Sequence, residues 1–259
     1  MLINSAAFAS PDERSGGIRA DFHTHTVFSD GKNTPEEMVL AAIEKGMACI
    51  GFSDHSYTGF DESYCMKKEA IPAYRAEIAR LGEKYADKIT VLCGIEQDYY
   101  SDEPVDGYDY VIGSVHYVKA GDVYIPVDHT PAALKAGIDD YFGGDANAFA
   151  AEYFRTVGDV VRKTRADIIG HFDLLTKFIE REPLFDTSDA AYRAAWMAAA
   201  DSLASTGKQL FEINTGAISR GYRTSPYPSE EQRMYIALHG CRFIMSSDSH
   251  RTDTLLFGF

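Results

Sequence analysis

Short apolar runs alternate with amphipathic segments along most of this chain. Runs rich in β-branched and aromatic residues, too short for helices, predict strands over 18–22, 48–53, 89–95, 108–114, 167–170, 209–213 and 242–245. Helical spacing of apolar residues predicts helices over 35–45, 69–85, 145–163 and 188–205, with further helices opened by Thr130 and Ser229. Such alternation is typical of a parallel sheet whose two faces are both covered.

Local signals fix several of these boundaries. Thr34 is a strong N-cap, Pro35 suits the first helical position, and Glu37 completes a capping box. Ser229 begins a similar box. The segment 117–127 turns at an Ala-Gly-Asp sequence and predicts a β-hairpin that interrupts the strand–helix alternation.

Polar residues follow nearly every predicted strand, which favours a closed or distorted barrel over an open sheet. A barrel gathers the C-terminal ends of its strands around one mouth, whereas an open sheet leaves the outer ends far apart. The 259 residues match one barrel domain, and no linker divides them, so we predict a single domain over 1–259. Residues 1–17 lack the pattern of a signal peptide and are interpreted as a leader or a wrapping segment.

Composition narrows the function. The net charge of −14 disfavours binding of long nucleic acid or of an anionic membrane surface, because both need clustered basic residues. No run of apolar residues is long enough to span a membrane. The four cysteines form no CxxC pair and are interpreted as free thiols, which indicates a cytoplasmic protein.

The candidate chemistry lies at the strand ends. His23 and His25 share one face of an extended strand, so both imidazoles can reach one point. Imidazoles and carboxylates without thiolates suit zinc, manganese or iron, and the set is large enough for two or three such ions. Taken singly, each residue is more often structural, and Asp30 before a glycine could be only a turn. The candidates are His23, His25, Asp30, Asp54, His55, Glu96, His116, His171, Asp248 and His250. We exclude His129 as a loop residue and His239 as a helix-end residue.

These motifs resemble those of the polymerase and histidinol phosphatase (PHP) superfamily over residues 19–251. They are His23-Thr24-His25 with Asp30-Gly31, Asp54-His55, Glu96, Ser114-Val115-His116, Gly170-His171 and Asp248-Ser249-His250. Within the superfamily the chain is most similar to monofunctional histidinol-phosphate phosphatases. That finer similarity rests on Tyr117, the Gly-His-Phe-Asp sequence at 170–173, and Asn214-Thr215-Gly216 with Arg220.

The resemblance implies a distorted (β/α)7 barrel with a trinuclear site of divalent transition metals. It assigns one metal to His23, His25, Glu96 and Asp248, a second to Glu96, His116 and His171, and a third to Asp30, His55 and His250. Asp54 is expected to orient a ligand from behind. Glu96, Asp248 and His250 are the catalytic assignments, in a reaction where a metal-bridging hydroxide attacks the phosphorus of a phosphomonoester and releases inorganic phosphate.

Arginines are expected to complete the phosphate site through bidentate contacts. Arg220 and Arg223 follow the sixth strand and are the first candidates. Lys177 and Arg181 follow the fifth strand, but ordinary surface charge explains them at least as well. Tyr117 is a candidate for the substrate pocket, or it packs the barrel top.

Three functions remain open. The preferred one is hydrolysis of L-histidinol phosphate in histidine biosynthesis. The second is another phosphoesterase of the superfamily, acting on nucleotides or short oligonucleotides with the same metal chemistry. The third is a metal-binding module without catalysis. The oligomeric state is not predicted.

Overall fold

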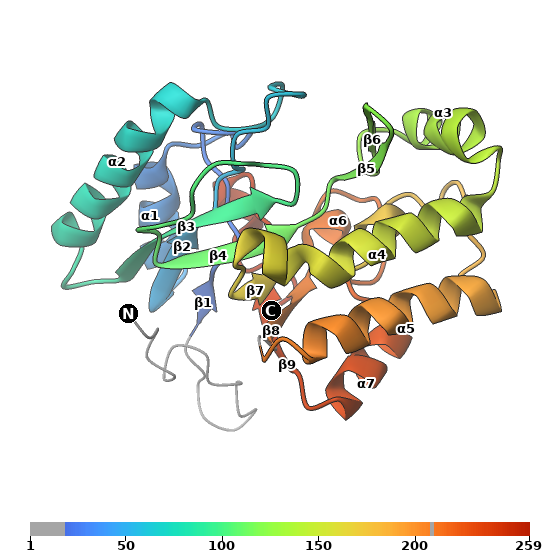
Figure 1. The fold of residues 1–259 in the computed structure, drawn as a ribbon. Coiled ribbons are helices and arrows are strands. Elements are labelled where there is room, and N and C mark those ends of the chain that lie inside the picture. Colours follow the sequence, from blue (N-terminus) through green and yellow to red (C-terminus); the bar gives the residue numbers. More distant parts are fainter. Residues whose placement is uncertain (1–18, 208–209) are drawn as a thin grey trace.

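Seven parallel strands form the centre of the computed structural model, which describes residues 19–207 and 210–259 (Figure 1). In the sheet they follow the order β1-β2-β3-β4-β7-β8-β9. Their bounds are β1 Ala20–Asp21, β2 Cys49–Phe52, β3 Thr90–Asp98, β4 Tyr110–Ser114, β7 Ile168–Ile169, β8 Leu210–Asn214 and β9 Arg242–Ser246. All seven predicted strands are present, and β3 is longer than predicted, so Glu96 lies inside it.

The sheet closes almost completely where its first and last strands meet. Just past the ends of β1 and β9, the His25 amide donates to the carbonyl of Ser249 at 2.8 Å, and the Ser249 amide donates to the carbonyl of His23 at 3.1 Å. Below this bridge the Asp21 carboxylate accepts from the Ser247 amide at 3.2 Å. The predicted α/β class and seven-stranded barrel are therefore confirmed, with one distorted seam in place of a full ladder.

Helices cover the outside of the barrel. They are α1 Pro35–Glu44, α2 Ile71–Lys84, α3 Pro131–Phe142, α4 Ala146–Thr164, α5 Ala190–Ala204, α6 Gly216–Ser219 and α7 Glu230–Leu238, with 3-10 turns η2 Lys68–Ala70, η3 Leu174–Thr176 and η4 Thr252–Thr254. In Figure 1, α1 and α2 lie on one side of the strands, and α4, α5 and α7 lie on the other. The capping box predicted for α1 is present, because Thr34 accepts from the Glu37 amide and Glu37 accepts from the Thr34 amide. The short α6 was not predicted.

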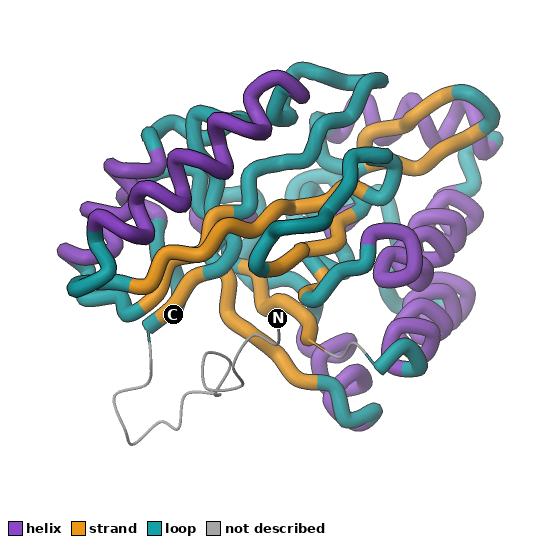
Figure 2. The backbone as a smooth tube through the Cα atoms, turned by 60° about the vertical axis from the view of Figure 1, so that its left-hand side comes forward, coloured by secondary structure: helices purple, strands orange, loops and turns teal. Residues whose placement is uncertain are grey.

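The predicted hairpin is also present. Strands β5 Tyr117–Ala120 and β6 Val123–Pro126 pair in antiparallel fashion between β4 and α3. Figure 2 shows the hairpin projecting from the barrel. It continues directly from the end of β4, so it extends the wall of the barrel mouth.

A buried tyrosine fills the middle of the barrel. The Tyr110 hydroxyl donates to the carbonyls of Phe22 and Phe52, at 2.5 and 3.0 Å, and so ties β4 to the residue after β1 and to the end of β2. Gly94 makes room for it: a Cβ there would lie 2.3 Å from the Tyr110 ring. A larger apolar core lies between the strands and the helices, with Phe154 of α4 and Trp196 of α5 buried within it.

The predicted leader at 1–17 lies outside the described residues. Across 19–207 and 210–259, the helices are all too short or too polar to cross a membrane.

Candidate metal centre

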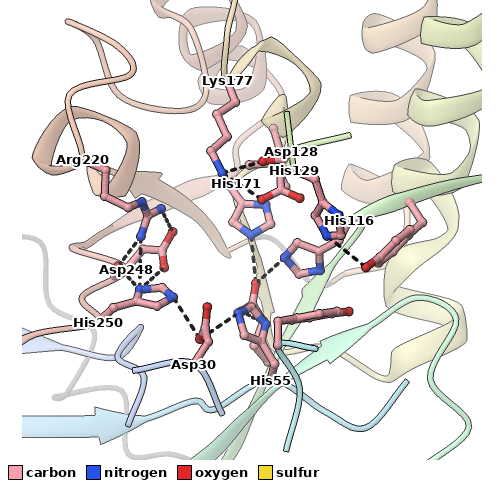
Figure 3. Close-up of a pocket in the computed structure, with 14 residues that line it drawn as sticks. Asp30, His55, His116, Asp128, His129, His171, Lys177, Arg220, Asp248 and His250 are labelled. Atoms are coloured by element: carbon pink, nitrogen blue, oxygen red, sulfur yellow. Dashed lines mark hydrogen bonds and ion pairs between the residues drawn. The ribbon is translucent and has the colours of Figure 1, made fainter. Parts of the chain in front are cut away.

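A cavity of about 230 Å³ opens at the C-terminal ends of the barrel strands (Figure 3). Its walls come from the loops after six barrel strands, from Glu96 within β3, and from the β5–β6 hairpin and the segment that follows it. The lining residues are Asp30, His55, Tyr64, Glu96, His116, Tyr117, Asp128, His129, His171, Leu174, Lys177, Arg220, Asp248 and His250. Strand ends that are far apart in the sequence therefore meet at one mouth, as the barrel prediction requires.

Glu96 lies between two groups of histidines. Its Oε2 is 3.2 Å from Nε2 of His23 and 3.5 Å from Nε2 of His25. Its Oε1 is 2.9 Å from Nε2 of His171 and 3.4 Å from Nε2 of His116. The side chain is fully buried, so each carboxylate oxygen faces a different pair of imidazoles. This is the geometry of a carboxylate that can bridge two cations.

A third group lies nearer the solvent. Oδ1 of Asp30 is 3.2 Å from Nε2 of His250 and 3.7 Å from Nε2 of His55. The ring of His25 stacks between these two imidazoles, at centroid distances of 4.2 and 4.3 Å. His55 also reaches Glu96, with Nδ1 2.9 Å from Oε2. The three groups are thus continuous with one another.

Asp248 follows β9 and contacts the pair of histidines that follows β1, His23 and His25. Its Oδ1 is 3.4 Å from Nε2 of His25, and its Oδ2 accepts from Arg220 at 2.9 Å. The residue has a positive φ of 50°, a conformation that aspartate tolerates better than most residues. Arg220 also donates to the Asp248 carbonyl at 3.0 Å, which fixes this strained turn against the site.

The polar atoms of the cluster fit divalent metals. Buried ligand atoms without a hydrogen-bond partner in the described chain include His23 Nε2, His25 Nε2, Asp30 Oδ1 and Glu96 Oε2. Such atoms are costly to bury unless something binds them. Three sets of residues bring ligand atoms within 4.8 Å of one another: His25, Asp30, His55 and His250; His23, His25 and Asp248; and His55, Glu96 and His116. Nitrogen and oxygen donors of this kind suit zinc, manganese or iron.

The pKa values follow from this crowding. Burial lowers the pKa of His23, but the carboxylates of Glu212 and Glu96 outweigh it and raise that pKa well above its ordinary value. Burial, with His250 and His55 close by, lowers the pKa of His25 to about 3. Burial opposes ionisation of Glu96, yet the neighbouring imidazoles hold its pKa well below the usual range. Glu96 is thus ionised, and the His25 imidazole is neutral and free to act as a ligand.

Three buried carboxylates form hydrogen bonds to the candidate ligands, or to the turn that carries one, and so fix their positions. Asp54 accepts from Thr26 and Ser29, and so fixes the turn that leads to Asp30. Asp98 accepts from Nδ1 of His116 at 3.0 Å. Glu212 lies 2.6 Å from Nδ1 of His23.

Of these three supports, the sequence identified only Asp54. Asp98 lies two residues after Glu96 on the same strand face, a spacing that could have revealed it. Glu212 is an acid inside an otherwise apolar strand, which is also a signal.

The predicted substrate-binding residues fall into two groups. Arg220 and Tyr117 line the cavity. Arg181 instead donates to the carbonyl of Gly221 on the surface, and Arg223 packs over the Tyr227 ring, so neither of these two arginines lines the cavity. The physical reason is that α6 and the turn after it direct Arg220 towards Asp248 but carry Arg223 away from the mouth.

Two further residues line the cavity. Lys177, named from the sequence beside Arg181 although ordinary surface charge explains it at least as well, donates to Oδ2 of Asp128 at 3.1 Å. His129, which the sequence excludes as a metal ligand, lies in the loop before α3 and also lines the cavity, where its Nε2 is 3.3 Å from the Tyr117 hydroxyl. The hairpin brings this segment back to the mouth, which no local pattern reveals. His239 lies elsewhere, on the surface beside Asp201.

Comparisons with known proteins agree with this geometry. The PHP domain family model matches residues 21–216. A Deinococcus radiodurans protein named "Probable histidinol-phosphatase" is 30% identical over 92% of this chain and 89% of its own length, and a Schizosaccharomyces pombe protein of the same name is 26% identical over 83% and 74%. The crystal structure of HisK from Listeria monocytogenes superposes with a TM-score of 0.79 at 19% identity, over 93% of this chain and 98% of that one.

A second solved structure contains ligands. Histidinol phosphate phosphatase from Lactococcus lactis, complexed with zinc, L-histidinol and phosphate, has a TM-score of 0.65 at 24% identity and covers 91% of this chain and 87% of that chain. These likenesses confirm the fold, and the family match covers most of the chain. The chain therefore belongs to the PHP domain family, and the clustered histidines and carboxylates at its barrel mouth are metal-binding groups of a phosphoesterase of that family.

Proposed function

We propose that this protein is a metal-dependent phosphatase that hydrolyses L-histidinol phosphate to L-histidinol and inorganic phosphate. The observation that carries the proposal is the position of Glu96, whose two oxygens face separate groups of imidazoles at 2.9–3.5 Å. A bridging carboxylate of this kind is what a two-metal hydrolytic site requires.

Residues of the cluster would hold two or three divalent transition metals, zinc, manganese or iron. The first group is His23, His25, Glu96 and Asp248, the second is Glu96, His116 and His171, and the outer group is Asp30, His55 and His250. When bound, such cations supply an activated water as nucleophile and positive charge for the phosphoryl oxygens. The buried carboxylates keep that charge balanced in a site with little solvent.

The phosphate would be held by two positively charged side chains that line the cavity. Arg220 and Lys177 both line the cavity, and each is now paired with a carboxylate, Asp248 and Asp128 (Figure 3). A dianionic phosphate offers oxygens to both donors. Both terminal nitrogens of Arg220 contact Asp248, but each carries two N–H groups, so Arg220 can keep these contacts and still donate to the substrate. No side chain of the protein is needed as a nucleophile.

The side chains on the outer wall of the cavity are suited to a small substrate that has a ring and a cationic group. Tyr64 and Tyr117 present aromatic surface, and Asp128 and His129 present polar atoms. A cavity of about 230 Å³ fits a small monoester better than an oligonucleotide. The names of the D. radiodurans and S. pombe relatives point to the same substrate.

A nucleotide substrate is the main competitor. The DNA polymerase/3'-5' exonuclease PolX of Bacillus subtilis is 30% identical, but over only 39% of this chain and 19% of that protein. The net charge of −14 also disfavours a long polyanion. A metal-binding module without activity is the third possibility, and the same assay tests it.

The deciding experiment compares kcat/KM for three phosphomonoesters with metal-loaded protein, measured as phosphate release. The panel is L-histidinol phosphate, a nucleoside monophosphate and p-nitrophenyl phosphate. We expect L-histidinol phosphate to exceed the others by at least about 100-fold, because a pocket built around polar groups rejects ligands that leave them unpaired. Comparable values would refute the substrate, and no turnover of any monoester by metal-loaded protein would favour the non-catalytic module.

A further inference from the structure

One barrel strand brings no candidate metal ligand to the mouth. In the described chain, six of the seven barrel strands carry or lead into a histidine or carboxylate of the cluster; these are β1, β2, β3, β4, β7 and β9. Strand β8 ends at Asn214, and its one charged residue is Glu212, which is 1% exposed. A carboxylate buried this deeply needs partners that repay its loss of water.

Those partners belong to two different metal groups. Oε1 of Glu212 is 2.6 Å from Nδ1 of His23, on the side of the ring away from Glu96. Oε2 accepts from the backbone amide of His171 at 3.0 Å and from the Asn214 side chain at 3.2 Å. One carboxylate thus holds a ring from the first group with one oxygen and the backbone of a ligand from the second group with the other.

We propose that Glu212 is a positioning residue shared by the two inner metal sites, and that it couples their affinities. The inference rests on the proposed metal cluster. A hydrogen bond from Nδ1–H to a carboxylate fixes the tautomer of His23, so that Nε2 presents its lone pair to a metal. The bond to the His171 amide fixes the end of β7, so that the ring stays 2.9 Å from Oε1 of Glu96.

Asp98 provides a natural comparison because it supports one ligand only. Its Oδ2 is 3.0 Å from Nδ1 of His116 and 3.3 Å from the backbone amide of the same residue. Its Oδ1 accepts from the Tyr100 amide, outside the cluster. Glu212 therefore touches both inner sites, whereas Asp98 touches only the site that contains His116.

The test compares Glu212→Gln with Asp98→Asn. Each substitution keeps the shape and replaces one oxygen by an amide group, so neither side chain can accept all of its present bonds. Metal-free proteins are titrated with Co²⁺ in competition with a chromogenic chelator, and the visible ligand-field bands of bound Co²⁺ report the geometry. Circular dichroism and thermal unfolding of the metal-free proteins check the fold.

We expect Glu212→Gln to lower the Co²⁺ affinity of both inner sites by about 10- to 100-fold and to change both sets of bands. Asp98→Asn should weaken one inner site by the same factor and leave the other within about twofold. Both metal-free variants should still unfold cooperatively, at a somewhat lower temperature than the parent protein, because each loses a buried hydrogen-bond partner of a histidine. If Glu212→Gln does not fold, Glu212→Asp, which keeps the charge but is too short to reach both partners, should give the same two-site loss.

Three results would overturn the proposal: unchanged Co²⁺ affinity in Glu212→Gln, loss at one site alone, or an equal two-site loss in Asp98→Asn. The measurement uses no substrate. A protein that binds Co²⁺ as expected but does not hydrolyse L-histidinol phosphate would contradict the proposed substrate and leave the role of Glu212 intact.

Discussion

Gly216 lies against both Asp248, a proposed metal ligand, and Arg220, a proposed phosphate-binding residue. A Cβ on this residue would lie 2.7 Å from Oδ2 of Asp248, 2.8 Å from the Asp248 Cβ and 2.7 Å from Nη2 of Arg220. Ordinary contact begins near 3.4 Å, so the Asp248 side chain must move by about 0.7 Å. The strained backbone at Asp248, with its positive φ, leaves little freedom for that movement.

Gly216→Ala should therefore impair function more than folding. Misplacement of a reacting group by about 1 Å costs about 100-fold in rate, so we expect kcat/KM to fall by about 10- to 100-fold. Overpacking at a buried position should lower the free energy of unfolding by about 1–3 kcal/mol. The assays are phosphate release from metal-loaded protein and urea unfolding followed by circular dichroism.

Gly82→Ala is the matched control. Gly82 lies inside α2, and a Cβ there would meet only the carbonyl of Val91, at 3.8 Å. The same added methyl should raise the free energy of unfolding by about 0.5–1 kcal/mol through helix propensity and leave kcat/KM unchanged. Parent-like kcat/KM in Gly216→Ala would refute our account of how Asp248 and Arg220 are held.

Three further predictions concern stability. Tyr110→Phe removes the hydroxyl that donates to Phe22 and Phe52 and should cost about 1–3 kcal/mol in urea unfolding, whereas Tyr141→Phe on the surface should change stability by less than about 0.5 kcal/mol. Metal at 100 times its Kd should add about 2.7 kcal/mol for each occupied site, which raises Tm by about 5–10 °C in calorimetry; no rise in Tm would argue against specific binding. Burial opposes protonation of His23 and His116, but nearby carboxylates raise both pKa values well above normal. The protonated histidines therefore stabilise the folded metal-free protein. This stabilisation is full below about pH 6.5 and is lost as the pH rises through the raised pKa values. Metal displaces these protons, so the Tm difference between loaded and metal-free protein should widen between about pH 6 and pH 8, and a constant difference would contradict this assignment.

The barrel could be predicted because its strands and ligands are both local signals. Apolar runs followed by a histidine or an acid mark the strand ends, and a parallel barrel brings those ends together without further information. His23, Glu96 and His171 are far apart in the sequence, yet their ligand atoms lie within 2.9–3.2 Å of a partner in the cluster.

Residues that depend on how distant segments fold back were harder to find. His129 reaches the mouth because the β5–β6 hairpin turns the chain around, and its sequence neighbours only mark a helix start. Arg223 follows the same strand as Arg220, but one further turn places its guanidinium against Thr176 and Tyr227. Glu212 is separated from His23 by most of the chain, and only closure of the barrel brings them together.

The most direct test of the account is anomalous diffraction from crystals grown with zinc or manganese. We predict two peaks about 3.5–4 Å apart, one beside each oxygen of Glu96, with the first near His23 and His25 and the second near His116 and His171. A single ion bound away from Glu96, or no peak in the cavity at saturating metal, would contradict a metal centre bridged by this carboxylate.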